Sequence, residues 1–333
     1  MLRLPRFELR APETIDEVIA ALEQPGARLV AGGTDILPNL KHRLDRPPVL
    51  VSLSRVAGLS KVEVDEKAGL LRIGARVTLT GLSEHPQVCE RLPSLAKAAG
   101  LVASPLIRNM GTLGGNVNLD TRCRYVNQTS FWREAIGGGC LKSEGDVCHV
   151  VPSGRKCVAA MSSDCVPVLI SLDARVVLVG PQGRRELLLE DYYQADGTRH
   201  TTRGDGELTT ELVVPLPRGP RRSAYAKWTV RGSIDFPLVS VALRFELEED
   251  RVSAPVREAH AVVGVLGARP RRITRLEDAR GKALDDPALA ALVAERVHAQ
   301  CKPLENVPYE APYRRQMLRV HARRAIAALV AEG

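Results

Sequence analysis

Residues 107–118 read Ile-Arg-Asn-Met-Gly-Thr-Leu-Gly-Gly-Asn-Val-Asn, and the chain then carries four grouped cysteines, Cys123, Cys140, Cys148 and Cys157. Glycines let backbone N–H groups approach an anion without a Cβ in the way, so residues 107–118 predict a loop that presses against a phosphate. The four thiols after it indicate a metal site. The stretch from residue 107 to residue 157 therefore combines a candidate anion-binding loop with a candidate metal-binding loop.

A second glycine-rich turn lies nearer the N-terminus. The apolar run at residues 27–31 predicts a buried strand, and Gly32, Gly33, Thr34 and Asp35 follow it directly. A strand that ends in glycines, a hydroxyl and a carboxylate is typical of a turn that receives a pyrophosphate or a ribose, although a Gly-Gly pair also forms simple tight turns. Neither glycine-rich segment has the spacing of the Rossmann fingerprint or the Gly-Lys-Ser/Thr of a Walker A loop, so a dinucleotide would be held in a different way.

The composition is that of an ordinary folded protein. The chain has 333 residues, 44% of them apolar and 26% charged, and this length predicts two or three domains. It has no apolar run of about 18 residues and no signal-peptide pattern, so we expect a cytoplasmic protein without a membrane span. The net charge of +8 is spread among 39 acidic residues, and aromatic residues make up only 4%. This pattern favours a well-solvated, arginine-rich surface over a nucleic-acid partner, with a docking face for acidic proteins as the alternative.

Seven cysteines in a cytoplasmic chain favour reduced thiols or metal ligands over disulfides, because that compartment keeps thiols reduced. We expect the three outside the group, Cys89, Cys165 and Cys301, to be ordinary small residues. The four grouped thiols suit a structural zinc ion or a cubane iron–sulfur cluster. None of them forms the close C-x₂₋₄-C pair typical of zinc sites, so the spacing favours a cluster, with zinc and unligated thiols left as alternatives.

The hydrophobic periodicity predicts mixed α and β structure along the whole chain. Residues 13–24 should form an amphipathic helix, because Thr14 and Glu17 have the capping-box spacing. The segment at residues 215–222, rich in proline and arginine, is the best candidate for a domain boundary. The expected strands are 49–53, 70–74, 175–179, 212–214, 224–230, 238–245 and 259–266, and the other expected helices are 95–102, 162–174, 288–298 and 313–330.

Both glycine-rich segments resemble the paired FAD motifs of the flavin subunits in the xanthine dehydrogenase family of molybdenum hydroxylases. The segment Ser163-Asp164-x-x-Pro167-x-Leu169 and the residues around Tyr313 are also similar to that family. The resemblance implies FAD as a cofactor, with the Asp164 carboxylate on a polar group of FAD and Lys227 near the flavin; an exposed strand lysine is the alternative for Lys227. The residues that it places at the cofactor are Leu29, Val30, Ala31, Gly32, Gly33, Thr34, Asp35, Ile36, Asn109, Met110, Gly111, Thr112, Gly114, Gly115, Asn116, Asn118, Asp164 and Lys227.

The same resemblance implies an α+β fold. It predicts a two-lobed FAD-binding fold like that of vanillyl-alcohol oxidase, also called PCMH-like, with lobes at residues 1–55 and 56–216. A C-terminal α+β domain at residues 217–333 should carry a three-stranded antiparallel sheet and helices. Most flavin subunits of the family pass directly from the Gly-Gly-Asn loop to the Ser-Asp helix, so the cysteine region at about residues 120–160 is an insertion in the second lobe.

This insertion resembles one branch of the family, the β subunits of 4-hydroxybenzoyl-CoA reductases. The similar residues lie at 120–123, 132–136 and 140–142. The resemblance implies a [4Fe–4S] cluster, and its ligands would be Cys123, Cys140, Cys148 and Cys157.

The implied activity is electron transfer within a molybdenum enzyme, with no catalytic residue in this chain. The sequence agrees, since it has neither a Gly-x-Ser-x-Gly elbow nor a His-Glu-x-x-His motif. The resemblance implies that ferredoxin reduces the cluster and that electrons pass through FAD to two [2Fe–2S] clusters of a small subunit. A large molybdenum subunit would then reductively dehydroxylate 4-hydroxybenzoyl-CoA. Two alternatives stay open: the FAD subunit of a hydroxylase or dehydrogenase of an aromatic or N-heterocycle that passes electrons outward, and a non-catalytic FAD- or zinc-binding assembly module.

Overall fold

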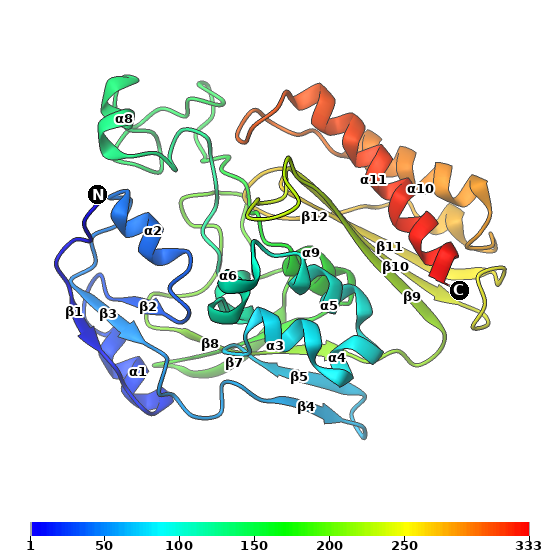
Figure 1. Cartoon of the computed structure of the whole chain (residues 1–333), viewed down its shortest axis with the longest axis horizontal. Coiled ribbons are helices and arrows are strands. Elements are labelled where there is room, and N and C mark those ends of the chain that lie inside the picture. Colours follow the sequence, from blue (N-terminus) through cyan, green and yellow to red (C-terminus); the bar gives the residue numbers. More distant parts are fainter. Residues whose placement is uncertain (1, 333) are drawn as a thin grey trace.

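The computed structural model describes residues 2–332 and contains three β-sheets with helices packed against them (Figure 1). The N-terminal lobe is a three-stranded parallel sheet in the order β1-β3-β2. Its elements are β1 (Glu8–Arg10), α1 (Ile15–Leu22), β2 (Arg28–Val30), α2 (Ile36–Lys41) and β3 (Val49–Ser52). The predicted capping box begins α1, where the Thr14 hydroxyl accepts a hydrogen bond from the Glu17 backbone N–H at 3.2 Å. The cap starts the helix that buries Val18 against this sheet.

The second lobe is built on a five-stranded antiparallel sheet in the order β4-β5-β8-β6-β7. Alternate residues of its strands, such as Leu71 and Ile73, share one core with the helices of the lobe, as period-two alternation requires. The strands are β4 (Val62–Asp65), β5 (Leu70–Gly74), β6 (Arg175–Gly180), β7 (Gly183–Leu188) and β8 (Leu208–Pro215). The helices are α3 (Leu79–Glu84), α4 (Pro86–Arg91), α5 (Pro93–Gly100), α6 (Pro105–Met110), α7 (Leu113–Val117) and α9 (Cys165–Ser171).

The C-terminal sheet has the order β12-β11-β10-β9 and is apolar on both faces. Val241 and Val263 belong to the core beneath the two C-terminal helices, whereas Ala242 and Val262 belong to the core shared with the second lobe. The sheet is therefore held between α10 and α11 on one side and α5 and α9 on the other (Figure 1). Its elements are β9 (Arg221–Trp228), β10 (Val239–Leu247), β11 (Val256–Gly264), β12 (Arg271–Arg272), the 3₁₀ turn η1 (Glu277–Ala279), α10 (Pro287–Gln300) and α11 (Ala311–Glu332).

The α+β class that the sequence predicts is confirmed, with one correction in the C-terminal sheet. A fourth strand, β12, joins the three expected ones, and its two residues are too few to leave an alternating pattern in the sequence. The division of the chain at residues 55 and 216 stays a prediction. Among residues 2–332, no helix combines the length and the apolar character needed to cross a membrane.

The glycine-rich segment at residues 107–118 is not the continuous loop that its composition predicts. It forms the end of α6 and the whole of α7, joined through the extended backbone of Gly111. Polar side chains start both helices: the Ser104 hydroxyl accepts from the Ile107 N–H, and the Thr112 hydroxyl accepts from the Gly115 N–H. These caps offset the low helix propensity of the glycines.

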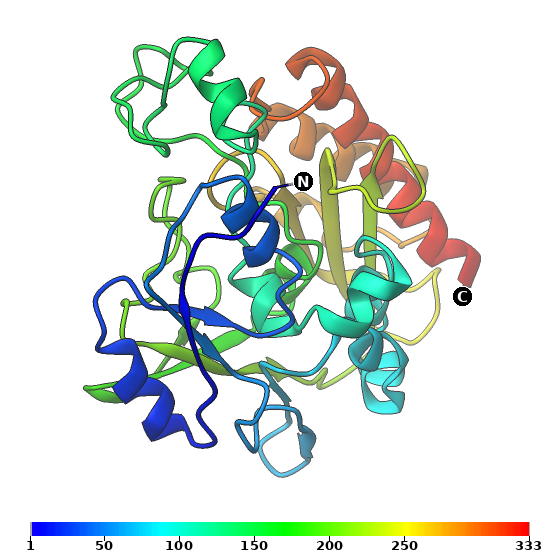
Figure 2. The same ribbon diagram turned by 60° about the vertical axis from the view of Figure 1, so that its left-hand side comes forward.

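Residues 120–160 contain one short helix, α8 (Ser130–Ala135), and lie at the edge of the molecule beside α2 (Figures 1 and 2). The buried Arg133 guanidinium donates to the carbonyls of Gln128 and His42, the latter at 3.3 Å. Since His42 ends α2 and Gln128 lies in the insertion, Arg133 ties the cysteine region to the N-terminal lobe.

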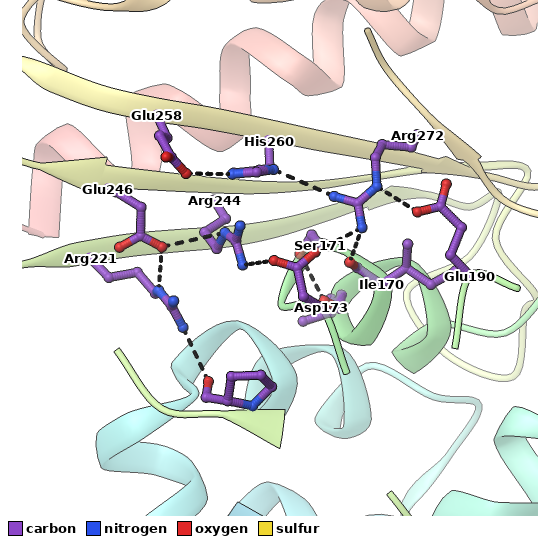
Figure 3. A network of polar contacts seen from close by, with 12 residues as sticks. Ile170, Ser171, Asp173, Glu190, Arg221, Arg244, Glu246, Glu258, His260 and Arg272 are labelled. Atoms are coloured by element: carbon purple, nitrogen blue, oxygen red, sulfur yellow. Dashed lines mark hydrogen bonds and ion pairs between the residues drawn. The ribbon is translucent and has the colours of Figure 1, made fainter. Parts of the chain in front are cut away.

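A polar network joins the C-terminal sheet to the second lobe (Figure 3). Asp173, which follows α9, accepts from Arg244 of β10 at 2.7 Å and from Arg272 of β12 at 3.0 Å. Arg272 also donates to Glu190 at 2.6 Å and to the Ile170 carbonyl at 2.7 Å. The Arg244 side chain is only 5% exposed, and two carboxylates neutralise this buried cation, Asp173 at 2.7 Å and Glu246 at 3.4 Å.

We predict that Asp173→Asn destabilises the chain by about 1–2 kcal/mol, less than for a fully buried pair because the Asp173 side chain is 41% exposed. Asn is the suitable replacement, since Asp173 has a φ of +55° and Asn tolerates that left-handed backbone. Denaturant unfolding measures the loss, with exposed Asp205→Asn as the matched control.

The loss of stability caused by Asp173→Asn should become smaller at low pH. Burial opposes ionisation of Asp173, but Arg244 and Arg272 outweigh it, and the pKa of the carboxyl is lowered. A lowered pKa stabilises the folded state above the unfolded-state value of about 3.9 and stops doing so as the pH falls below it. The difference between wild type and Asp173→Asn should therefore be constant near neutral pH and shrink below about pH 4; a constant difference down to that range would contradict this role.

Candidate functional site

The two glycine-rich segments, far apart in sequence, touch in the structure. A Cβ added to Gly32 would overlap the carbonyl oxygen of Met110, and a Cβ added to Gly111 would lie 3.4 Å from the Thr34 hydroxyl. Gly32 therefore lets the end of α6 approach its backbone, whereas the contact of Gly111 with Thr34 is at an ordinary distance. The structure thus brings together the two segments that resemble paired FAD motifs.

The first segment is a tight turn between β2 and α2. Gly33 has a φ of +72°, a conformation that favours glycine, and its carbonyl accepts from the Leu37 N–H at 3.2 Å. Asp35 stands at the start of α2 but makes no capping hydrogen bond there. Its carboxylate instead pairs with the guanidinium of Arg122, the residue before the first grouped cysteine.

Polar groups of the second segment form hydrogen bonds with neighbouring residues of the second lobe, and these bonds fix its conformation. The Gly114 N–H donates to the Ala75 carbonyl at 2.7 Å. The Asn116 side chain, which is buried, accepts from the Ser163 hydroxyl at 2.5 Å and from the Cys165 N–H at 3.2 Å. Asn118 accepts from the Tyr192 hydroxyl at 2.5 Å. These hydrogen bonds tie Asn116 and Asn118 to other parts of the second lobe. The expected contact of the two asparagines with the cofactor stays a prediction.

Asp164 and Lys227, expected near the flavin, form a buried ion pair with 3.1 Å between Oδ1 and Nζ. The Tyr225 hydroxyl donates to the same carboxylate oxygen at 2.7 Å, and Lys227 also donates to the Leu101 carbonyl at 2.6 Å. Burial raises the pKa of Asp164, and Lys227 opposes that rise. The Lys227 side chain is 9% exposed, so it is not the solvated strand lysine that was the alternative.

The four grouped cysteines converge on one pocket. The cavity inside this pocket is small, about 10 Å³, and it is partly open to solvent. Its lining residues are Cys123, Tyr125, Val126, Cys140, Leu141, Cys148, His149, Val150, Cys157, Val158 and Ala159. We call it the thiol pocket. The convergence of four thiols that are widely spaced along the chain is what a multi-cysteine metal site requires.

Backbone N–H groups point at the sulfur atoms of the thiol pocket. Burial raises the pKa of Cys123, and the N–H groups of Tyr125 and Val126 partly offset the rise by donating to its sulfur. Burial also raises the pKa of Cys157 to about 11, and the backbone N–H of Ala159 partly opposes this rise. Burial therefore disfavours the thiolate form of Cys123 and Cys157, and the backbone N–H groups favour it.

The four thiols are not gathered around a single point. Among residues 2–332, no group of three or more His, Cys, Asp or Glu side chains lies close enough to hold one metal ion. Four thiolates on one zinc ion would stand about 3.8 Å apart, given a Zn–S distance of about 2.3 Å. The thiolates of a cubane cluster each bind a different iron atom and so lie farther apart. A structural zinc ion and a cubane cluster therefore require different spacings of the same four thiols.

Arg122 connects the thiol pocket to the first glycine-rich segment. It pairs with Asp35, lies over the Phe236 ring at 4.6 Å, and precedes the pocket residue Cys123. Burial lowers the pKa of Arg122 to about 10, which still leaves it charged near neutral pH. Sequence reasoning missed Arg122 because nothing in its neighbourhood marks it as buried. Tyr225 was detectable, since residues 225 and 227 share one face of a strand.

The fold and the paired glycine-rich segments define an FAD-binding protein, and comparison with known proteins shows which kind. Residues 5–217 match the family described as FAD binding domain in molybdopterin dehydrogenase, and residues 223–329 match the CO dehydrogenase flavoprotein C-terminal domain. The chain belongs to the FAD-binding medium subunits of the xanthine dehydrogenase and carbon monoxide dehydrogenase family of molybdenum hydroxylases.

Three relatives illustrate the match. The aldehyde oxidoreductase FAD-binding subunit of Escherichia coli (strain K12) is 36% identical over 68% of this chain and 73% of its own length. The carbon monoxide dehydrogenase medium chain of Hydrogenophaga pseudoflava is 29% identical over 97% of this chain and 96% of its own. A solved structure of the carbon monoxide dehydrogenase from that organism superposes with a TM-score of 0.78 at 26% identity, covering 99% of each chain. The expected FAD cofactor and family are thus confirmed, whereas the 4-hydroxybenzoyl-CoA reductase branch is not shown.

We predict that Gly32→Ala weakens FAD binding. The new Cβ meets the Met110 carbonyl, and overpacking of this kind costs about 1–3 kcal/mol. The FAD affinity should then fall roughly tenfold or more, because about 1.4 kcal/mol corresponds to a factor of ten. The flavin-to-protein ratio after purification, read from the visible absorbance, measures the loss.

Gly100→Ala is the matched control. It lies at the end of α5 in the second lobe, and its added Cβ meets the Ser83 Cβ at an ordinary 3.6 Å. Alanine also has the higher helix propensity, so this variant should keep its flavin and its melting temperature. Equal flavin content in the two variants would show that the contact between Gly32 and Met110 does not support the cofactor site.

Proposed function

We propose that the chain is the electron-transfer subunit of a molybdenum dehydrogenase and that it carries FAD together with a [4Fe–4S] cluster. The observation that supports the [4Fe–4S] cluster is the thiol pocket, which is lined by Cys123, Cys140, Cys148 and Cys157. A cubane cluster binds each thiolate through a different iron atom, which suits four ligands that come from separate points of one segment.

The residues of this chain would hold the two cofactors side by side. The segments at residues 29–36 and 109–118 would bind the diphosphate and flavin portion of FAD, and the pair of Asp164 and Lys227 would lie at the flavin. FAD and the cluster supply the electron chemistry when bound, since both accept and release single electrons. The pair of Asp35 and Arg122 fixes the first glycine-rich segment against the start of the cysteine region. The protein thus contributes position and charge, and it needs no nucleophile or general base.

The relatives favour outward electron flow. They are named as subunits of an aldehyde oxidoreductase, a carbon monoxide dehydrogenase and a nicotinate dehydrogenase. We therefore propose that the substrate, an aldehyde or an aromatic N-heterocycle, is oxidised on a large molybdenum subunit. A small subunit with two [2Fe–2S] clusters would deliver the electrons to FAD in this chain.

Inward flow is the second candidate function. In it, ferredoxin reduces the [4Fe–4S] cluster, and the complex removes the phenolic hydroxyl of 4-hydroxybenzoyl-CoA. The cysteine insertion favours it by resemblance, whereas the named relatives do not. The third candidate, a zinc-binding assembly module, is disfavoured because the four cysteines form no close C-x₂₋₄-C pair.

We predict that Cys148→Ser loses the cluster and keeps the flavin. Cys148 is a buried thiol of the pocket. Within residues 2–332, no hydrogen bond joins it to either glycine-rich segment. Anaerobic purification should give about four iron atoms per wild-type chain and far fewer in the variant, with equal flavin absorbance.

Cys89→Ser is the control, because Cys89 is an exposed thiol outside the pocket. It should retain both iron and flavin. A Cys148→Ser protein with wild-type iron content would remove Cys148 from the ligand set, and a wild-type protein with about one zinc and no iron would contradict the proposed cluster.

We predict that the purified complex passes electrons outward. Under anaerobic conditions its flavin absorbance should bleach on addition of an aromatic aldehyde or nicotinate. Reduced ferredoxin should give no dehydroxylation of 4-hydroxybenzoyl-CoA. Turnover of that thioester, with no bleaching by aldehydes or N-heterocycles, would favour the second candidate instead.

A further inference from the structure

Lys142 is a buried cation in the middle of the cysteine region. It lies between Cys140 and Cys148 in sequence, and its side chain is only 11% exposed. The residues that line the thiol pocket include no Lys, Arg, Asp or Glu. A charged side chain that acts on the thiols must therefore lie outside this lining. Arg122 and Arg133 are the other cations of the cysteine region whose side chains have little exposure.

The ammonium group of Lys142 is held in one position by several acceptors. It donates to Asp120 Oδ1 at 2.5 Å, to the Gly197 carbonyl at 2.9 Å, and to the hydroxyl and carbonyl of Thr121. Thr121 is fully buried, and its hydroxyl also donates to the Gly197 carbonyl at 2.9 Å. A lysine with its donors occupied in this way has lost the mobility of a surface side chain.

The segment that anchors Lys142 also packs against Cys157. The Gly197 N–H donates to the Cys157 carbonyl at 2.8 Å, and the Cys157 N–H donates to Asp196 at 3.2 Å. A Cβ added to Gly197 would stand 2.9 Å from the Cys157 sulfur, so this segment forms a wall of the thiol site. Lys142 is therefore fixed to the same backbone that positions a thiol of the pocket.

We propose that Lys142 is a positioning residue that sets the reduction potential of the cluster in the thiol pocket. This inference rests on the proposed [4Fe–4S] cluster. Four thiolates give such a cluster a net negative charge, which grows by one on reduction, and nearby charge is one of the terms that set its potential. A fixed positive charge in a poorly solvated site stabilises the reduced form and is little screened by salt. Lys142 thus makes the cluster a better electron acceptor, and Asp120 moderates its effect.

The test measures the midpoint potential of the cluster in the purified chain by redox titration followed by EPR. Lys142→Gln should shift the potential to more negative values, and Lys142→Arg should restore it to near the wild-type value. Lys156→Gln is the matched control, because Lys156 is an exposed lysine adjacent to Cys157 and water screens its charge. It should leave the potential almost unchanged.

Asp120→Asn distinguishes charge from structural support. Removing the carboxylate leaves the positive charge of Lys142 less compensated, so the potential should move to more positive values, opposite to Lys142→Gln. An unchanged potential in Asp120→Asn, or an iron-loaded Lys142→Gln protein with the wild-type potential, would overturn the inference. If Lys142→Gln fails to retain iron, the sign of the shift in Asp120→Asn decides. Absence of iron from the wild-type chain would instead refute the proposed cluster, so the two failures are distinguishable.

Discussion

The structure depends on the close backbone contact between Gly32 and Met110. A side chain at position 32 would push apart the turn after β2 and the end of α6, which belong to different lobes. The contact forms only because both lobes present their glycine-rich segments at the same edge. The core of the N-terminal lobe includes Leu208 of β8, so apolar packing joins the two lobes in addition to this contact.

The cysteine region extends this site and does not form a separate domain. Arg122 pairs with Asp35 of the first glycine-rich segment, and Arg133 donates to the end of α2. Both arginines belong to the insertion, and both partners belong to the N-terminal lobe. Buried cations are costly unless they are paired or hydrogen-bonded, so these contacts hold the insertion in a defined place beside the N-terminal lobe. The closeness of the two proposed cofactors thus follows from a few polar contacts across an otherwise irregular segment.

Much of the fold could be predicted from the sequence because its signals are local. The capping box at Thr14, the strand at residues 70–74 and the two C-terminal helices each follow from patterns within a few residues, and the structure has all of them. The grouping of four cysteines was visible for the same reason. The caps at Ser104 and Thr112 were overlooked, because glycine-rich composition suggested a loop.

The interactions that complete the site could not be predicted. Arg122 with Asp35, and Lys142 with Gly197, join positions that are far apart in sequence. Arg and Lys are usually exposed, so a single sequence gives no reason to bury these two among the many that the chain carries. Their burial depends on the irregular path of residues 120–160, which has too little regular structure for periodicity to reveal.

The most direct test of the central claim is a Mössbauer spectrum of the iron-57-enriched wild-type chain, purified without oxygen and compared with its flavin content. If the four cysteines bind the proposed cluster, the spectrum should be that of a [4Fe–4S] cluster, with about four irons for each FAD. A chain that binds FAD but has no iron, or holds zinc at the four thiols, would contradict it.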